Sequence, residues 1–121
     1  MHLAEGLRQS KLITCITGKI RDVLVDLRPD SLSFGRAEIV DISGESPATV
    51  FCPPGVAHGF IALDPGSIVT LAVDVPFSEV TEQAIDAFDP DLGIDWLMPK
   101  EDCVRSERDQ SAPQLRSLRL N

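Results

Sequence analysis

The sequence predicts an all-β domain, in the form of an antiparallel sandwich or barrel. Short segments rich in β-branched and apolar residues recur along the first two thirds of the chain, and one of them alternates between two faces. Ser-Gly, Pro-Pro-Gly and Asp-Pro-Gly turn sequences separate these segments. The 121 residues are enough for one hydrophobic core, so we expect a single domain over residues 1–121.

The alternating segment is Ile20–Arg28, in which Asp22 and Asp26 share one face with Leu24 while the other face is apolar. An alternation with a period of two residues is typical of a strand with two distinct faces. Five further strands are expected at Lys11–Thr17, Arg36–Ile42, Ala48–Phe51, Gly59–Leu63 and Ile68–Val75.

The pattern changes after Pro76. In Phe77–Phe88, Ser78 is a candidate N-cap, which favours a brief helical turn. The segment Asp89–Trp96 is expected to be a loop with apolar anchors, and no strong periodicity follows Lys100. We therefore expect short helical segments near the C-terminus.

The charge balance argues against two classes of partner. The chain has 11 basic and 19 acidic residues, a net charge of −8, whereas nucleic acids and anionic membranes attract cationic proteins. No apolar run approaches the ~20 residues of a membrane span. Residues 1–20 alternate charged with apolar residues and lack the apolar centre of a signal peptide. Neither a nucleic acid nor a membrane is an expected partner.

The cationic residues are unevenly distributed. Between Ala37 and Pro99 there is no Lys or Arg, whereas 11 acidic residues fall there. Arginines from both ends of the chain could therefore meet an anionic ligand such as a diphosphate. Ordinary solvated charge is the alternative.

The three cysteines, Cys15, Cys52 and Cys103, are odd in number and widely spaced. No Cys-x-x-Cys pair is present, which excludes a zinc ribbon and a thioredoxin-like motif. Free thiols in a reducing cytosol are expected, and with them a cytoplasmic location.

A Pro-x-Gly-x-x-His motif begins at Pro53 and ends at His58, where a turn leads into a strand. It is similar to the second signature of cupin barrels, in which this histidine is often a metal ligand. In the first signature, Lys11 stands where an acidic ligand belongs, and the residue two positions after His2 is Ala4. A metal needs several deprotonated ligands, so we expect neither a metal nor another cofactor.

A series of sequence blocks extends this similarity along almost the whole chain. They are Met1-His2, Lys11-Leu12-Ile13, Gly18, Asp22–Arg28, Ser33–Arg36, Pro53–Phe60, Asp89–Trp96, Ser106–Asp109 and Ala112-Pro113. In order and spacing the series resembles the dTDP-4-dehydrorhamnose 3,5-epimerase family. The resemblance implies a cupin-type antiparallel β jelly roll, in which part of Phe77–Phe88 is a strand and not a helical turn. It also implies an isomerase acting on a nucleotide-linked 4-keto-6-deoxy sugar.

The same resemblance implies roles for individual residues. His2 matches the base that removes a proton α to the ketone, and Asp109 matches the carboxylate that orients it. Lys11 matches the cation that meets the developing oxyanion. The residues expected to bind substrate are Asp22, His58 and Arg28.

Three departures from the family pattern stand out. The family's long segment before the Met1-His2 position is missing, so we expect an N-terminally short domain. The tyrosine that serves as general acid aligns with Leu71, and the chain contains no tyrosine. Ala4 replaces a glutamine or similar residue. A water molecule is then the only candidate for the second proton donor.

Two other functions remain open. One is a repurposed cupin catalyst acting on another carbonyl substrate, and the other is a non-catalytic, degenerate binding module. Loss of the family's first strands should leave a sheet edge and apolar surface exposed, which favours self-association. A homodimer is therefore expected.

Overall fold

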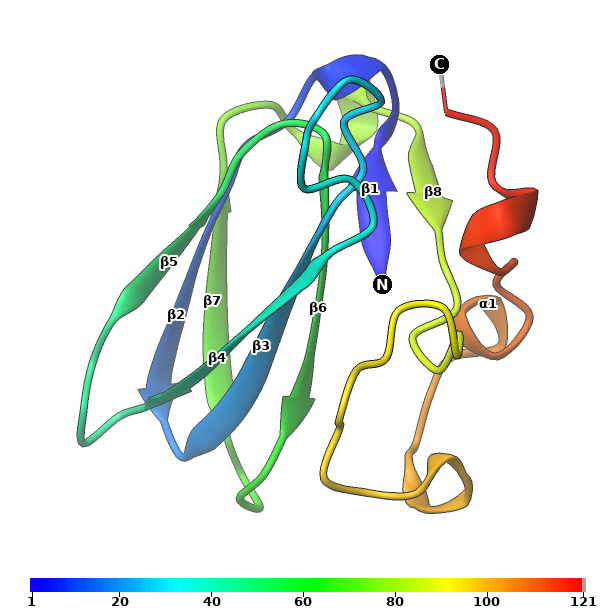
Figure 1. Ribbon diagram of the computed structural model, residues 1–121. Helices are drawn as coiled ribbons and strands as arrows, with labels where there is room; N and C mark the ends of the chain where they lie inside the picture. The colour runs from blue at the N-terminus through cyan, green and yellow to red at the C-terminus, as the bar shows by residue number, and fades with distance from the viewer. Residues whose placement is uncertain (121) are drawn as a thin grey trace.

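The computed structural model describes residues 1–120, and its core consists of two antiparallel sheets that face each other (Figure 1). One sheet has the strand order β4-β3-β6-β1-β8 and the other has the order β5-β2-β7. The strands are β1 (His2–Ala4), β2 (Lys11–Thr17), β3 (Lys19–Asp26), β4 (Ala37–Ser43), β5 (Thr49–Cys52), β6 (Val56–Ala62), β7 (Ile68–Val73) and β8 (Glu82–Ala84). The all-β antiparallel prediction is confirmed.

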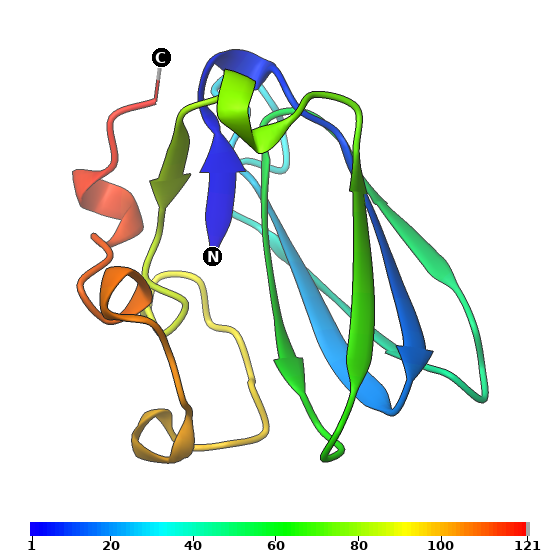
Figure 2. The ribbon, with the colours of Figure 1, turned by 180° about the vertical axis from the view of Figure 1, so that it is seen from behind.

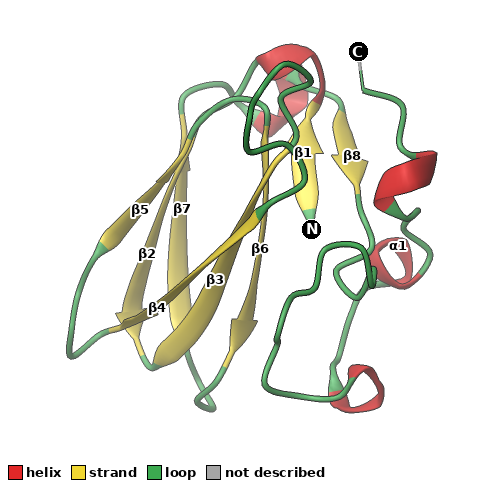
Figure 3. Ribbon diagram, in the orientation of Figure 1, coloured by secondary structure: helices red, strands yellow, loops and turns green. Residues whose placement is uncertain are grey.

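The helical elements are all short, and most of them lie toward the C-terminus (Figure 3). The α-helix α1 spans Glu107–Gln110, and 3₁₀ helices span Glu5–Leu7, Phe77–Glu79, Lys100–Asp102 and Leu115–Ser117. The segment 77–88 starts with the expected helical turn and then continues as β8. No helix in the described chain has the length and apolar character needed to cross a membrane.

The C-terminal segment forms a third layer, which Figure 2 shows from behind. It covers part of the outer face of the five-stranded sheet, so strand β3 is buried on both sides, whereas the edge strand β4 stays partly exposed. On strand β3, Val23 and Val25 are fully buried toward the C-terminal layer, in a cluster that includes Leu92 and Trp96. Ile20 belongs to a second cluster, between the two sheets. The predicted alternation is thus present, but it separates two interior faces.

The interior between the sheets is apolar toward one end and polar toward the other. Ile13, Cys15 and Val50 pack in its apolar part. Lys11 lies two residues before Ile13 on strand β2, on the same face, and is only 4% exposed. The barrel interior therefore holds the buried ammonium group of Lys11 next to a cluster of apolar side chains.

Candidate active site

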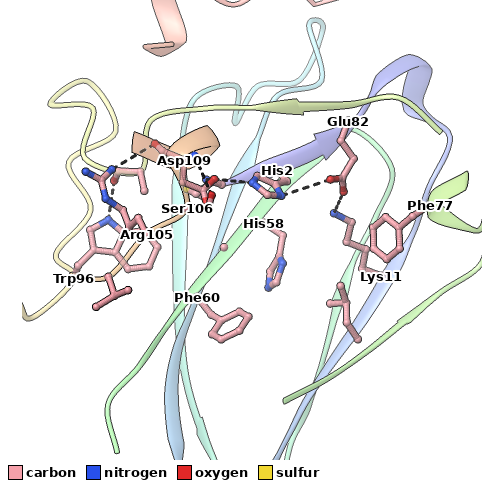
Figure 4. A pocket seen from close by; sticks show the side chains of 15 residues that line it. His2, Lys11, His58, Phe60, Phe77, Glu82, Trp96, Arg105, Ser106 and Asp109 are labelled. Carbon is pink, nitrogen blue, oxygen red and sulfur yellow. Dashed lines mark hydrogen bonds and ion pairs between the residues drawn. The ribbon is translucent and has the colours of Figure 1, made fainter. Parts of the chain in front are cut away.

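A pocket of about 470 Å³ opens between the two sheets and the C-terminal layer (Figure 4). Both sheets and α1 contribute polar side chains to it, and several apolar side chains complete its wall. The polar side chains of the lining are His2, Lys11, His58, Glu82, Arg105, Ser106 and Asp109.

His2 enters the pocket from β1, where it pairs directly with His58 of β6. Its Nε2 lies 2.7 Å from Oδ1 of Asp109. The two side chains are 32% and 30% exposed, so solvent and a ligand can both reach them. When Nε2–H donates to Asp109, the neutral ring presents Nδ1 as its basic nitrogen.

Asp109 is held in place by the start of α1. The hydroxyl of Ser106, the N-cap residue, accepts a hydrogen bond from the Asp109 amide at 3.1 Å. Burial acts to raise the pKa of Asp109, but the hydrogen bond and the charge of His2 outweigh it and leave this pKa below its usual value. The carboxylate is therefore ionised at neutral pH and stabilises an imidazolium at His2.

Lys11 enters the same pocket from the opposite sheet. Its Nζ lies 3.6 Å from Oε1 of Glu82, and its side chain is 4% exposed. His2, Lys11 and Asp109, the three catalytic residues expected from the sequence, thus line one cavity. A basic imidazole and a buried ammonium across a cavity are the groups needed to remove a proton beside a carbonyl and to stabilise the resulting oxyanion.

Glu82 lies at the centre of this group and was not expected from the sequence. Its carboxylate is 3.5 Å from Nδ1 of His2 and also contacts Lys11. Arg108 reaches both the carboxylate, at 3.4 Å, and the backbone carbonyl of Glu82, at 3.0 Å. The three-residue strand β8 places Glu82 here by pairing with β1. A strand of three residues is too short to show an alternation of apolar and polar side chains in the sequence.

His58 and Asp22 form a second buried pair. Nε2 of His58 lies 2.5 Å from Oδ1 of Asp22, and Asp22 is fully buried on β3. Oδ2 of Asp22 has no hydrogen-bond partner among the described residues. Of this pair, only His58 lines the pocket, and Asp22 lies behind it, so the substrate-binding role of Asp22 stays a prediction. Direct contact with substrate stays a prediction for His58.

Arg28 lies outside the pocket lining. Its guanidinium donates to both carboxylate oxygens of Asp26, each at 2.9 Å. This interaction, with the hydroxyls of Ser31 and Ser33, holds the pKa of Asp26 well below its usual range despite the opposing effect of burial. Arg28 therefore stabilises the loop after β3 in this chain, and its contact with substrate stays a prediction.

The wall beside Lys11 is apolar. Leu71 of β7 lines the pocket at the position where the family tyrosine was expected, and Phe77 is also part of the lining. Cys52, directly opposite Lys11 on β5, does not supply a nucleophile, because burial raises the pKa of its thiol to about 11. Among residues 1–120 there is also no cluster of three or more His, Cys, Asp or Glu side chains suited to a metal ion.

Together these features define a cupin-type barrel whose pocket carries acid–base groups. A family model described as dTDP-4-dehydrorhamnose 3,5-epimerase matches residues 1–117. The chain therefore belongs to the dTDP-4-dehydrorhamnose 3,5-epimerase family. This result confirms the resemblance found in the sequence.

Individual relatives agree with this assignment. The epimerase of Mycobacterium tuberculosis strain CDC 1551 is 36% identical over 93% of this chain and 56% of its own length. The crystal structure of the Elizabethkingia anophelis epimerase is 36% identical, with a TM-score of 0.89 over 95% of this chain and 63% of that one. The Legionella pneumophila epimerase, solved with dTDP-4-keto-L-rhamnose, is 33% identical, with a TM-score of 0.83 over 98% and 62% of the two chains. The chain thus spans little more than half the length of these relatives.

Proposed function

We propose that this protein is an epimerase-type isomerase that acts on a nucleotide-linked 4-keto-6-deoxy sugar. The observation that carries the proposal is the placement of His2, Lys11 and Asp109 in one pocket, with Asp109 fixed on the imidazole at 2.7 Å. Family membership supports the substrate class. The groups fit proton abstraction α to a ketone, which needs a base, a partner for that base and a stabiliser of the enolate.

In the proposed mechanism, the C–H bond beside the C4 ketone breaks and its proton passes to Nδ1 of His2. The electron pair moves into an enolate whose oxygen faces the Lys11 ammonium. Asp109 stabilises the imidazolium, because its carboxylate accepts the hydrogen bond from Nε2. The net charge of the site is unchanged in this step, since one positive and one negative charge appear together. Little solvent reorganisation is then required in the buried part of the pocket.

A proton then returns to carbon from the other face of the sugar ring. Leu71 cannot supply it, so we propose a water molecule as the donor. The hydroxide that remains takes up the proton of the His2 imidazolium, directly or through solvent, and the site returns to its starting state. A positioned acid is worth about 100- to 10,000-fold in rate, so this step should be slow.

The partner is proposed to be a dTDP-linked sugar. Arg105 lines the pocket, and its guanidinium stacks 5.1 Å from the centre of the Phe88 ring. A cation at this wall supports binding of the diphosphate of such a sugar.

All three cysteines are free, which supports the expected cytoplasmic location. Large apolar side chains exposed on the three-stranded sheet, among them Leu12, Ile16 and Phe51, support the expected homodimer.

Deuterium exchange tests the proposal. We expect dTDP-4-dehydro-6-deoxyglucose, incubated with the protein in D₂O, to lose its proton NMR signal at C3 or C5. A repurposed cupin catalyst would process another carbonyl compound and leave this sugar unlabelled, and a binding module would bind it without exchange. Exchange no faster than with the His2→Asn variant would rule out the proposed activity.

A further inference from the structure

We infer that Glu82 is a positioning residue that couples the base to the oxyanion-binding cation. The inference rests on the proposed function, because it concerns how His2 and Lys11 are held for that reaction. Among residues 1–120, Glu82 is the one whose side chain forms ion-pair contacts with both of them. Figure 4 shows its carboxylate between the imidazole and the ammonium group.

The contacts use the two oxygens of one carboxylate. Oε2 lies 3.5 Å from Nδ1 of His2, and Oε1 lies 3.6 Å from Nζ of Lys11. Asp109 holds Nε2, and the Glu82 carboxylate faces Nδ1, the nitrogen that takes up the proton in the proposed mechanism, so Glu82 stabilises the imidazolium once that proton has arrived. His2 and Lys11 come from different sheets, so Glu82 also ties the two walls of the pocket together at the reacting centre.

The Glu82 carboxylate balances the positive charge of the buried Lys11 ammonium. The side chain of Lys11 is 4% exposed and that of Glu82 is 16% exposed, so neither charge is fully solvated. An ammonium in such a place is costly without an anionic partner. Glu82 supplies that partner, and at 3.6 Å the contact leaves ammonium hydrogens free to donate to a substrate oxygen.

Arg108 holds Glu82 itself in position. It donates to the carboxylate at 3.4 Å and to the Glu82 carbonyl at 3.0 Å. It also connects β8 with α1, the helix that carries Asp109. Arg108 thus fixes Glu82 relative to Asp109, the other partner of His2.

Two substitutions separate a charge-based role from a space-filling one. Glu82→Gln keeps the shape and removes the charge, whereas Glu82→Asp keeps the charge on a shorter side chain. We expect Glu82→Gln to lower kcat about 10- to 100-fold and Glu82→Asp to retain more activity, with thymidine diphosphate affinity unchanged in both. Glu79→Gln, on the exposed turn before β8, is the matched control and should behave like the wild type.

A second readout does not depend on turnover. The chain has two histidines, so the ring ¹⁵N signals of His2 and His58 are readily distinguished. Glu82→Gln should move the His2 ring signals and leave those of His58 in place. Unmoved His2 signals would overturn the inference even if the protein proves inactive on sugars. So would a Glu82→Gln enzyme that is as active as the wild type or more active than Glu82→Asp.

Discussion

Replacement of His2 by asparagine should lower the rate of α-proton exchange by about 100- to 10,000-fold, the usual worth of a positioned general base. Asparagine still offers an N–H to Asp109, but its amide does not accept a proton near neutral pH. Affinity for thymidine diphosphate should change little, because the imidazole serves the reacting carbon. The measurement is the rate of deuterium entry at C3 or C5 of the sugar, at saturating substrate.

Glu107→Gln is the matched control for this variant. Glu107 is exposed on α1, two residues from Asp109, and its side chain makes no contact in the pocket. The control should exchange protons at the wild-type rate. A His2→Asn variant that retains the wild-type rate would show that another group is the base.

Substitution of Lys11 by methionine is expected to lower kcat about 100- to 1,000-fold with a much smaller change in KM. Methionine fills a similar volume but offers no charge and no donor to the enolate oxygen, and such a donor acts mainly in the transition state. Lys19→Met, on the exposed first residue of β3, is the matched control. Steady-state kinetics on the 4-keto sugar measure both parameters.

Removal of Lys11 also leaves Glu82 without its ammonium partner. The unfolding midpoint should therefore be measured alongside the kinetics, so that a loss of folded protein is not read as a loss of turnover. If folded Lys11→Met protein keeps its kcat and loses only affinity, Lys11 binds substrate and does not stabilise the enolate.

The sequence predicted the long strands well because their signals are local. Lys11–Thr17 matches β2 in both bounds, and the alternation after Ile20 matches β3 within two residues at either end. In such segments side-chain alternation and turn residues decide the structure before any distant contact forms. The sequence did not indicate that both faces of β3 are buried. The C-terminal layer covers one of these faces, and its sequence has no periodic pattern of apolar residues from which that packing could be predicted.

The short strands were harder to foresee. β1 and β8 have three residues each, too few for a pattern, and they form because β1 pairs with β6 on one side and with β8 on the other. Glu82 went unnoticed for this reason. Arg28 shows a related limit, since β3 ends at Asp26 and the arginine folds back onto that carboxylate.

The site itself could be predicted only through the family resemblance. His2 and Asp109 are 107 positions apart, and no spacing rule relates them. Their pairing results from α1, which lies on the far side of β8 from β1 and carries Asp109 to His2 only in the folded chain (Figure 1). By contrast, the turn before His58 could be predicted from local chemistry, because Pro53 fixes its own φ angle and Gly55 permits the positive φ of 84° that the turn requires.

A crystal structure with a bound dTDP-linked 4-keto sugar, or a close analogue, would test the central claim most directly. The account predicts the ketone oxygen within hydrogen-bonding distance of Nζ of Lys11, and the hydrogen of C3 or C5 pointing at Nδ1 of His2. A sugar ring bound away from these two nitrogens, with the nucleotide alone in the pocket, would contradict it.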